Sequence, residues 1–409
     1  MSRLVPTLIV ILSVASALQA KAPEFNVDFN VGWGGCYRPM EWTPVEVGIA
    51  AKLKKPFGGT VTISAQQDDL TRMTVSHQFV LTPDLPLRLP LVTRFAFAAG
   101  NCTVRISNER GRTQWFYEYK LWDYSSSSRR LTAVGEDELL IGLVGRRVFG
   151  LAQLPNNTVC RSRSKNGRVY LKQKLPRLLP WDWTGYRSLD LLVLYDPDWE
   201  LINDHQAQAI AQWVSNGGKL LVVLGGRHLP AGHPIAKFLP VELGKLKQTA
   251  LDAEIVNRWG CSSAEGTSVA CRPMKPKPGS RIYNTSVFGT EEVLFSAGFV
   301  GFGQVGVLAF DPSVLKVRRQ NNTVQFWTSC FGALLGDSSD KTGRRTIAFE
   351  DGGNSDSNDY DYSFETGLAT RGANAVMEHL LSIKELRPLS IWWVIGLLTL
   401  LAVLIGPVD

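Results

Sequence analysis

Residues 219–228 read KLLVVLGGRH, an apolar stretch that runs into two glycines. Many α/β enzymes carry a catalytic nucleophile on such a turn between a strand and a helix, because the turn exposes the side chain beside backbone N–H groups. A nucleophile there must be Cys, Ser or Thr, activated by a nearby base. The turn offers Leu224, Gly225, Gly226 and Arg227. It has the glycines of a nucleophile turn and no side chain that can attack.

Two other groups of residues have donor atoms that bind metals. His228 and His233 follow the turn, and Asp196 could join them as a zinc ligand. Their spacing is not the four-residue interval that places two histidines on one helical face, which favours surface histidines on a loop. The acidic segment 351–361 does not fit the calcium-loop pattern, which needs Gly at its sixth position. We therefore predict no metal site and no cofactor.

Buried strands and one helix must position the glycine turn. Residues 139–145 and 189–196 are almost continuously apolar, which is typical of strands buried on both faces of a parallel sheet. Between the second strand and the turn, apolar residues recur at helical spacing over 202–216. Asn203 or Asp204 can cap the start of this helix, and Gly217 fits the left-handed position that ends it. The order predicts a doubly wound, flavodoxin-like α/β domain.

In a doubly wound sheet, ligands bind beyond the carboxyl ends of the parallel strands. Two segments of this chain follow such strands, 196–199 and 225–228. We therefore predict that the ligand-binding residues are Asp196, Trp199, Gly225, Gly226, Arg227 and His228.

The chain before this domain has a different pattern. Residues 23–124 contain short runs in which apolar and polar residues alternate, such as TVTIS and TVRIS, separated by turns. These runs predict an all-β, immunoglobulin-like sandwich. The polar segment 123–130 is a linker by composition, and the α/β domain is predicted at 131–337, with an insertion at 234–290.

The two ends of the chain resemble targeting and anchoring segments. Residues 1–20 have a basic residue, an apolar run and small residues in the order of an export signal, with an uncleaved anchor as the alternative. Residues 389–408 carry no charge and are long enough to cross a bilayer, so we predict a transmembrane helix there. The segment 338–388 is predicted to be a polar tether.

The orientation in the membrane follows from two opposing signals. Lys384 and Arg387 precede the predicted span and favour a cytoplasmic position for the preceding domains. The export signal favours the opposite side, and the first targeting segment usually dominates. We expect a protein of the cell membrane with extracytoplasmic domains, and the composition, with 44% hydrophobic and 20% charged residues, excludes a disordered chain.

Six cysteines in an exported protein can form up to three disulfides. The two pairs that we predict are Cys261–Cys271, which encloses a short loop, and Cys36–Cys102. The alternative is that several of these cysteines are small buried residues. No CxxC spacing occurs, which argues against zinc.

Basic and aromatic residues precede the second buried strand. The run 139–181 holds nine Lys or Arg and no acid, and we interpret it as a solvated face, with an anionic lipid surface or acidic polymer as the alternative and no nucleic acid as partner. Trp181 and Trp183 either stack on sugars or pack their loop onto the sheet.

Four stretches together resemble a known kind of protein. Residues 189–226 look like the central unit of class I glutamine-amidotransferase-like domains, and residues 301–327 resemble their last strand and closing helix. Residues 31–50 resemble the β-sandwich that precedes such domains in bacterial membrane proteins, and residues 390–409 resemble the membrane segment of those proteins. The resemblance implies an envelope protein, often encoded near chaperone-type ATPases and von Willebrand A domain proteins.

The resemblance also implies which catalytic residues to look for. Working amidotransferases of this class place Cys on the turn after the strand, with a His and a Glu from a later loop, and this chain lacks that set. We therefore predict a non-enzymatic, membrane-anchored envelope protein that binds proteins or ligands. The alternatives are a carbohydrate- or polymer-binding module that uses Trp181 and Trp183, and a hydrolase or amidotransferase-like enzyme with unusual residues.

Overall fold

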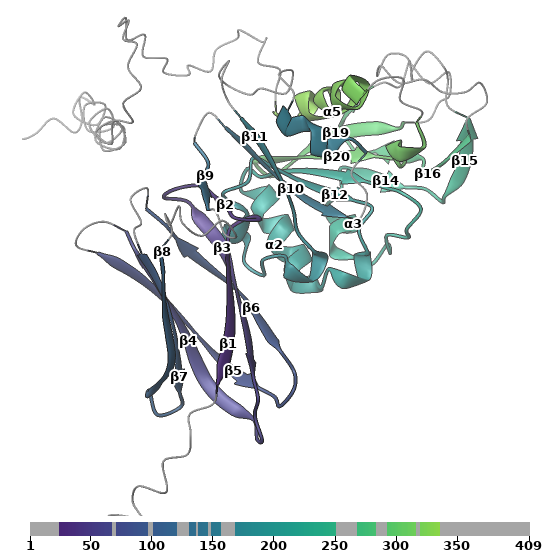
Figure 1. The fold of residues 1–409 in the computed structure, drawn as a ribbon. Helices are drawn as coiled ribbons and strands as arrows, with labels where there is room; N and C mark the ends of the chain where they lie inside the picture. Colours follow the sequence, from purple (N-terminus) through teal and green to yellow (C-terminus); the bar gives the residue numbers. More distant parts are fainter. Residues whose placement is uncertain are drawn as a thin grey trace, which may run out of the picture. The chain divides into compact units, whose positions relative to one another are not determined.

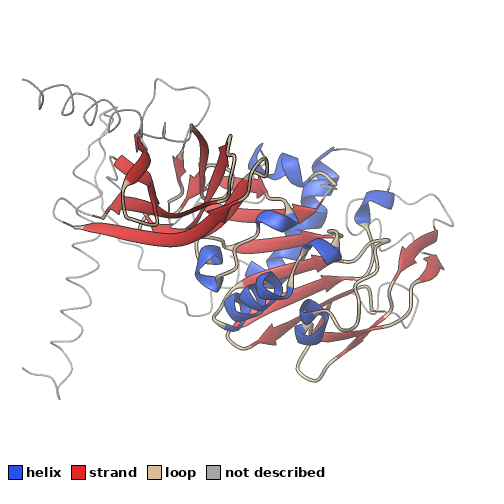
Figure 2. Cartoon of the chain, turned by 90° about the horizontal axis from the view of Figure 1, so that it is seen from below, coloured by secondary structure: helices blue, strands red, loops and turns tan. Residues whose placement is uncertain are grey.

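Strands outnumber helices along the chain (Figure 2), which is a β-rich protein. The computed structural model describes residues 24–67, 71–96, 101–120, 131–135, 138–145, 149–156, 168–250, 268–283, 293–315 and 320–335. All of these residues belong to one unit, Met1–Thr342.

The segments predicted to target and anchor the chain fall outside these ranges. The signal at 1–20, the tether at 338–388 and the membrane helix at 389–408 therefore stay predictions. Within the ranges that the structure describes, no helix is both long enough and apolar enough to cross a bilayer.

Residues 24–120, which we call the two-sheet region, form two antiparallel sheets (Figure 1). The three-stranded sheet has the order β1 (Phe25–Val31), β3 (Trp42–Ala51) and β6 (Leu87–Arg94). The four-stranded sheet has the order β5 (Arg72–Leu81), β4 (Phe57–Gln66), β7 (Asn101–Asn108) and β8 (Thr113–Lys120).

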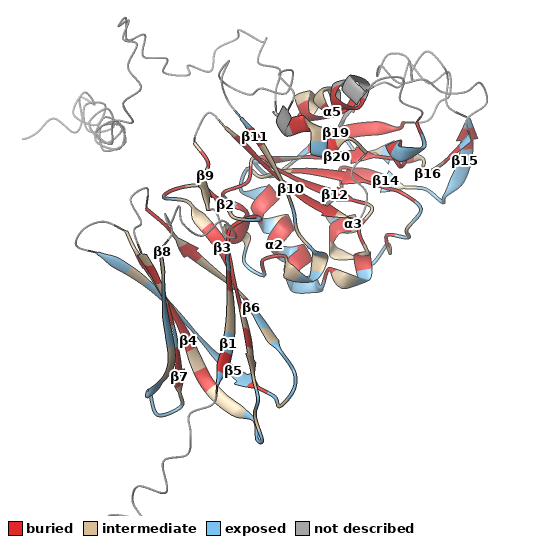
Figure 3. Ribbon diagram, in the orientation of Figure 1, coloured by how far each residue is buried: buried red, intermediate tan, exposed pale blue. Residues whose placement is uncertain are grey.

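The alternating sequence pattern explains why these sheets pack face to face. On β7, Cys102, Val104 and Ile106 are buried, whereas Arg105 between them is exposed. The buried residues share one core with apolar residues of β3, such as Val47 (Figure 3). One face of each sheet is thus covered by the other sheet.

A seven-stranded mixed sheet forms the core of residues 138–335, which we call the mixed-sheet region. Its order is β11 (Val169–Gln173), β10 (Leu139–Gly145), β12 (Leu191–Tyr195), β13 (Lys219–Val223), β20 (Gly303–Leu308), β19 (Phe295–Val300) and β18 (Arg281–Tyr283). Neighbouring strands from β11 to β20 are parallel, and β19 and β18 complete the sheet in antiparallel pairing.

Helices on both faces explain the continuous apolar runs of the parallel strands. Every residue of β12 is buried, as is every residue of β10 except the last. Helix α5 (Gln320–Leu335) covers one face, and α2 (Asp204–Ser215) with α3 (Pro234–Phe238) lies on the other (Figure 1). The predicted strand 139–145 coincides with β10.

Helix α2 begins and ends as its sequence predicts. The Asn203 side chain accepts a hydrogen bond from the backbone N–H of Gln206, and the Gln206 side chain accepts one from the N–H of Asn203. At the other end Gly217 has a φ of +107°, a left-handed conformation that glycine adopts without strain. Local chemistry therefore sets both boundaries.

Short elements complete the part of the chain that the structure describes. Two-stranded pairs join β14 (Val241–Leu243) with β17 (Met274–Pro276), β15 (Lys247–Ala250) with β16 (Ser268–Cys271), and β2 (Cys36–Tyr37) with β9 (Thr132–Ala133). The described residues also form the 3-10 helices η1 (Leu151–Asn156), η3 (Pro176–Leu178), η4 (Trp183–Tyr186), η5 (Trp199–Leu201) and η7 (Pro312–Val314). The segment predicted as an insertion, 234–290, holds α3 and β14 to β18.

A tryptophan from the two-sheet region lies inside the core of the mixed-sheet region. Trp33 is fully buried, its indole N–H donates to the carbonyl of Gly185 at 3.3 Å, and its ring packs against Tyr186. The ammonium of Lys174 lies 5.3 Å from the centre of the same indole. One large apolar side chain thus belongs to both regions.

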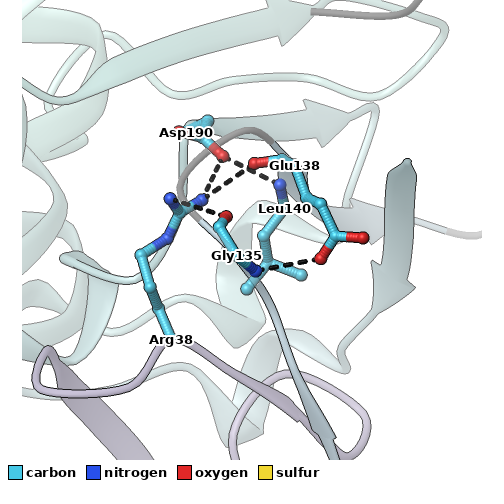
Figure 4. Close-up of polar contacts among 5 residues, drawn as sticks. All are labelled: Arg38, Gly135, Glu138, Leu140 and Asp190. Carbon is cyan, nitrogen blue, oxygen red and sulfur yellow. Dashed lines mark hydrogen bonds and ion pairs between the residues drawn. The ribbon is translucent and has the colours of Figure 1, made fainter. Parts of the chain in front are cut away.

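Arg38 makes a group of polar contacts, which we call the polar clamp (Figure 4). Its guanidinium lies 2.7 Å from the carboxylate of Asp190 and donates to the carbonyl oxygens of Gly135 and Glu138. The same Asp190 oxygen accepts the N–H of Leu140 at 2.8 Å. The side chains of Arg38 and Asp190 are only 14% and 15% exposed, so solvent cannot replace these bonds easily.

We expect Arg38→Ala to lower the free energy of unfolding by about 2–4 kcal/mol, because it removes the counter-ion of a largely buried carboxylate and the guanidinium donor of two carbonyls. Urea unfolding followed by tryptophan fluorescence measures this loss. Arg187→Ala is the control, because Arg187 pairs with Glu41 at 3.3 Å while both remain partly exposed. The control should cost less than about 1 kcal/mol. Equal losses of unfolding free energy in the two variants would show that the contacts of Arg38 do not stabilise the fold in this way.

Candidate functional site at the carboxyl ends of the parallel strands

Three neighbouring parallel strands end at the same edge of the mixed sheet. Asp196 follows β12, Gly225 and Gly226 lie just beyond β13, and Asp311 lies just beyond β20. Because these strands are adjacent and parallel, the segments that follow them meet. The structure thus brings together Asp196, Gly225 and Arg227 of the predicted set.

The carboxylate of Asp196 holds the glycine turn. One of its oxygens, Oδ1, accepts hydrogen bonds from the backbone N–H groups of Gly225 and Arg227, both at 3.2 Å. Asp196 itself has a φ of +41°, a left-handed conformation that is uncommon for a residue other than glycine. Such strain persists only where the surrounding structure enforces it. The two backbone bonds are the interactions that offset it here.

Gly225 is a glycine because the Asp196 carboxylate occupies the space of a side chain. A Cβ at Gly225 would collide with the carboxylate group of Asp196. At the next residue, Gly226, an added Cβ would meet no atom of the described residues within 4 Å. The two glycines of the turn therefore differ: the first is needed for close approach, and the second is not.

The charged side chains around the turn interact with near neighbours. Burial raises the pKa of the Asp196 carboxyl, the backbone bonds from Arg227 and Gly225 oppose that shift, and the nearby Asp311 adds to it. Arg227 also reaches Asp198, with 3.5 Å between Nη1 and Oδ2. Asp311 accepts a hydrogen bond from the Tyr195 hydroxyl at 2.7 Å. Within the residues that the structure describes, no cluster of three His, Cys, Asp or Glu could hold a metal ion.

Two residues predicted to bind a ligand, Trp199 and His228, differ in their exposure to solvent. Trp199 is 2% exposed and packs edge-on against His233, so it supports the loop and has no free face for a ligand. His228 is exposed, and its Nδ1 atom lies 3.2 Å from the guanidinium of Arg272. His233 caps α3 with its own ring nitrogen, which accepts from the N–H of Ile235. The two histidines therefore have different structural roles.

Sequence reasoning missed Arg272 and Asp311. Arg272 belongs to the segment predicted as an insertion, where no periodic pattern singles it out, yet it is 6% exposed and anchored by its N–H to the carbonyl of Ala309. Asp311 was visible in the stretch FDPS, whose position after a strand at the same edge was the available signal.

The tryptophans of the polymer-binding alternative are not equivalent. Trp181 is 52% exposed, whereas Trp183 is partly buried and packs against the core of the mixed-sheet region. The basic run also has no single environment, because Lys174 lies under Trp33 and burial lowers its pKa. Only part of the run 139–181 is described.

The predicted Cys36–Cys102 disulfide is wrong. Both residues are buried free thiols, and they belong to different cores: Cys36 packs with the mixed-sheet region and Cys102 with the two-sheet region. Burial raises the pKa of Cys102 to about 12. The Cys271 thiol lies 3.1 Å from the Thr249 hydroxyl. Cys261 lies outside the described residues, so the pair Cys261–Cys271 stays a prediction.

Comparisons with known proteins add little. No protein-family model matches the chain, and no curated protein matches it in sequence. Solved structures with partial similarity include β-glucosidase 3B from Thermotoga neapolitana (15% identity, TM-score 0.17, covering 24% of this chain and 16% of that one). Another is the putative ApaA protein from Bordetella pertussis (13% identity, TM-score 0.17, covering 24% and 89%). The chain spans about a sixth of the length of the β-glucosidase.

We expect Gly225→Ala to lower the free energy of unfolding by about 1–3 kcal/mol, because the new methyl group must displace the Asp196 carboxylate. Gly226→Ala is the matched control and should change it by less than about 1 kcal/mol. Adding Asp196→Gly to Gly225→Ala should recover part of the loss. It removes the collision with the new methyl group, and it places glycine, which adopts a left-handed backbone conformation without strain, at residue 196. Equal effects of the two alanines would show that the turn is not closed by Asp196.

Proposed function

We propose that this chain is a non-enzymatic, membrane-anchored binding protein of the cell envelope. In this proposal an export signal and a C-terminal transmembrane helix hold its domains outside the cytoplasm. The two-sheet region is an immunoglobulin-like sandwich, and the mixed-sheet region is a flavodoxin-like, glutamine-amidotransferase-like domain that binds rather than catalyses.

The single observation that carries the proposal is the position of the Asp196 carboxylate. In an enzyme with a nucleophile turn, backbone N–H groups at the turn stabilise the negative oxygen of the transition state. Here the N–H groups of Gly225 and Arg227 already donate to Asp196. A substrate oxygen would have to displace a carboxylate that the fold holds in place. The Asp196 carboxylate on these N–H groups and the missing nucleophile both argue against acyl transfer at this turn.

The strand order supports the domain assignment. The five parallel strands have the spatial order β11, β10, β12, β13 and β20, with β10 first in the chain. This is the 2-1-3-4-5 order of flavodoxin-like sheets. The fold class itself assigns no activity, because the same sheet serves many functions.

An aromatic surface on β8, of which Phe116 and Tyr117 are exposed, favours a protein partner. Strand β8 is the edge of the four-stranded sheet, and on one of its faces Trp115, Tyr117 and Tyr119 contact one another in a row. The opposing sheet has one strand fewer; its edge residue Phe29 covers Tyr119, while Tyr117 remains 53% exposed. Phe116 on the other face is 57% exposed. Exposed aromatic side chains are enriched where proteins bind one another.

A photo-crosslinking residue in place of Phe116, in the full chain in its own membrane, should join it to one discrete envelope protein. The control places the same residue at Val80, which is 66% exposed on β5, the opposite edge of the same sheet. We expect no discrete product from Val80, and Tyr117→Ser should weaken the product from Phe116.

Two results would contradict this proposal. One is equal labelling from Phe116 and Val80, which would mean that β8 has no specific partner. The other is release of ammonia from glutamine by the purified chain at a rate that falls in an Arg227→Ala variant, which would mean that the glycine turn is catalytic.

A further inference from the structure

We propose that the cavity beside Arg272 binds an organic anion, a carboxylate or phosphate group on an apolar body. This site is distinct from the aromatic surface of β8 and does not depend on it. The cavity has a volume of about 600 Å³. Its charged and titratable lining residues are His228, Lys237, Glu242, Lys245, Arg272 and Lys277.

Among the residues that the structure describes, no carboxylate pairs with the guanidinium of Arg272. The residue is 6% exposed, and no salt bridge joins it to any of the described residues. Its Nε atom is buried and has no hydrogen-bond partner in that part of the chain. A buried charge without its counter-ion is costly, so the side chain needs an anion to complete its environment.

The two hydrogen bonds that the Arg272 side chain makes both use Nη2 and fix the direction of the side chain. Its Nη2 atom lies 3.2 Å from His228 Nδ1 and 3.5 Å from the carbonyl oxygen of Arg227. Arginine can only donate, so His228 Nδ1 must carry a lone pair and the proton of the neutral ring must lie on Nε2. His228 thus has a second donor, at the rim of the same cavity.

Lysines make the rest of the cavity positive. Lys237, Lys245 and Lys277 line it against a single carboxylate, Glu242. The ammonium of Lys277 is held by the carbonyl of Leu239 at 2.7 Å, so one cation is fixed at the wall. Side chains with guanidinium and ammonium groups that line one cavity suit an oxyanion.

Apolar side chains define the remainder of the ligand. Leu229, Val241, Leu243 and Leu246 also line the cavity. A small inorganic ion would leave this surface and most of the volume uncovered. An apolar body attached to the charged group would fill it, which is the usual composition of a binding pocket for a small organic molecule.

Isothermal titration of the full chain in a non-ionic detergent tests this proposal. The probes are phenyl phosphate, benzoate, inorganic phosphate and uncharged benzyl alcohol. We expect phenyl phosphate or benzoate to bind, inorganic phosphate to bind more weakly, and benzyl alcohol not to bind. The stronger of the two aromatic anions identifies the charged group as a phosphate or a carboxylate.

Arg272→Gln should weaken binding of the preferred anion at least about tenfold, because it removes a charge-assisted hydrogen bond. Lys275→Gln is the matched control, since it removes one positive charge from an exposed neighbour that does not line the cavity, and it should leave the affinity unchanged. His228→Ala, at an exposed position, tests the site independently if Arg272→Gln unfolds the chain, and it should weaken the same anion.

Three outcomes would overturn the proposal. They are the absence of binding by both aromatic anions, equal binding of benzyl alcohol and the anions, and equal weakening by Lys275→Gln and by the two cavity variants. Crosslinking from Phe116 is unaffected by each of these results, so failure here is distinguishable from failure of the proposed protein-binding function.

Discussion

The carboxylate of Asp196 is the group on which the glycine turn at the end of β13 depends. It forces Gly225 to be a glycine, it occupies the backbone donors of Gly225 and Arg227, and it requires a left-handed conformation at its own residue. An enzyme with this topology would keep such donors open for its substrate. In this chain they contribute to folding, so the function that we propose depends on other surfaces.

Those surfaces lie on elements that are fixed to one another. Trp33 and Arg38 from the two-sheet region reach into the mixed-sheet region, where they meet Gly185 and Asp190. A buried indole and a largely buried ion pair stabilise the contact between the regions more than exposed ion pairs would. The aromatic row of β8 and the cavity beside Arg272 therefore lie on two regions that contact each other through buried side chains.

Sequence reasoning succeeded where local chemistry decides the structure. The capping residue Asn203, the terminating Gly217 and the apolar run of β10 each act within one element, so their pattern predicts the element. It failed where the decisive contact joins distant residues. Cys36 and Cys102 lie in different cores, and Trp199 lies buried because its large apolar ring gains more from packing than from solvent exposure. Nothing in the spacing of Arg272 shows that it approaches His228, 44 residues earlier.

Amide hydrogen exchange at single-residue resolution tests the central claim most directly. The account predicts slow exchange at Gly225 and Arg227 in the native chain and fast exchange at both in an Asp196→Gly variant. The N–H of Leu224, which donates to the carbonyl of Leu308 at 2.9 Å, should stay protected in both and serves as the internal control. If Gly225 and Arg227 exchange as fast in the native chain as in the variant, Asp196 does not occupy these donors and the account is wrong.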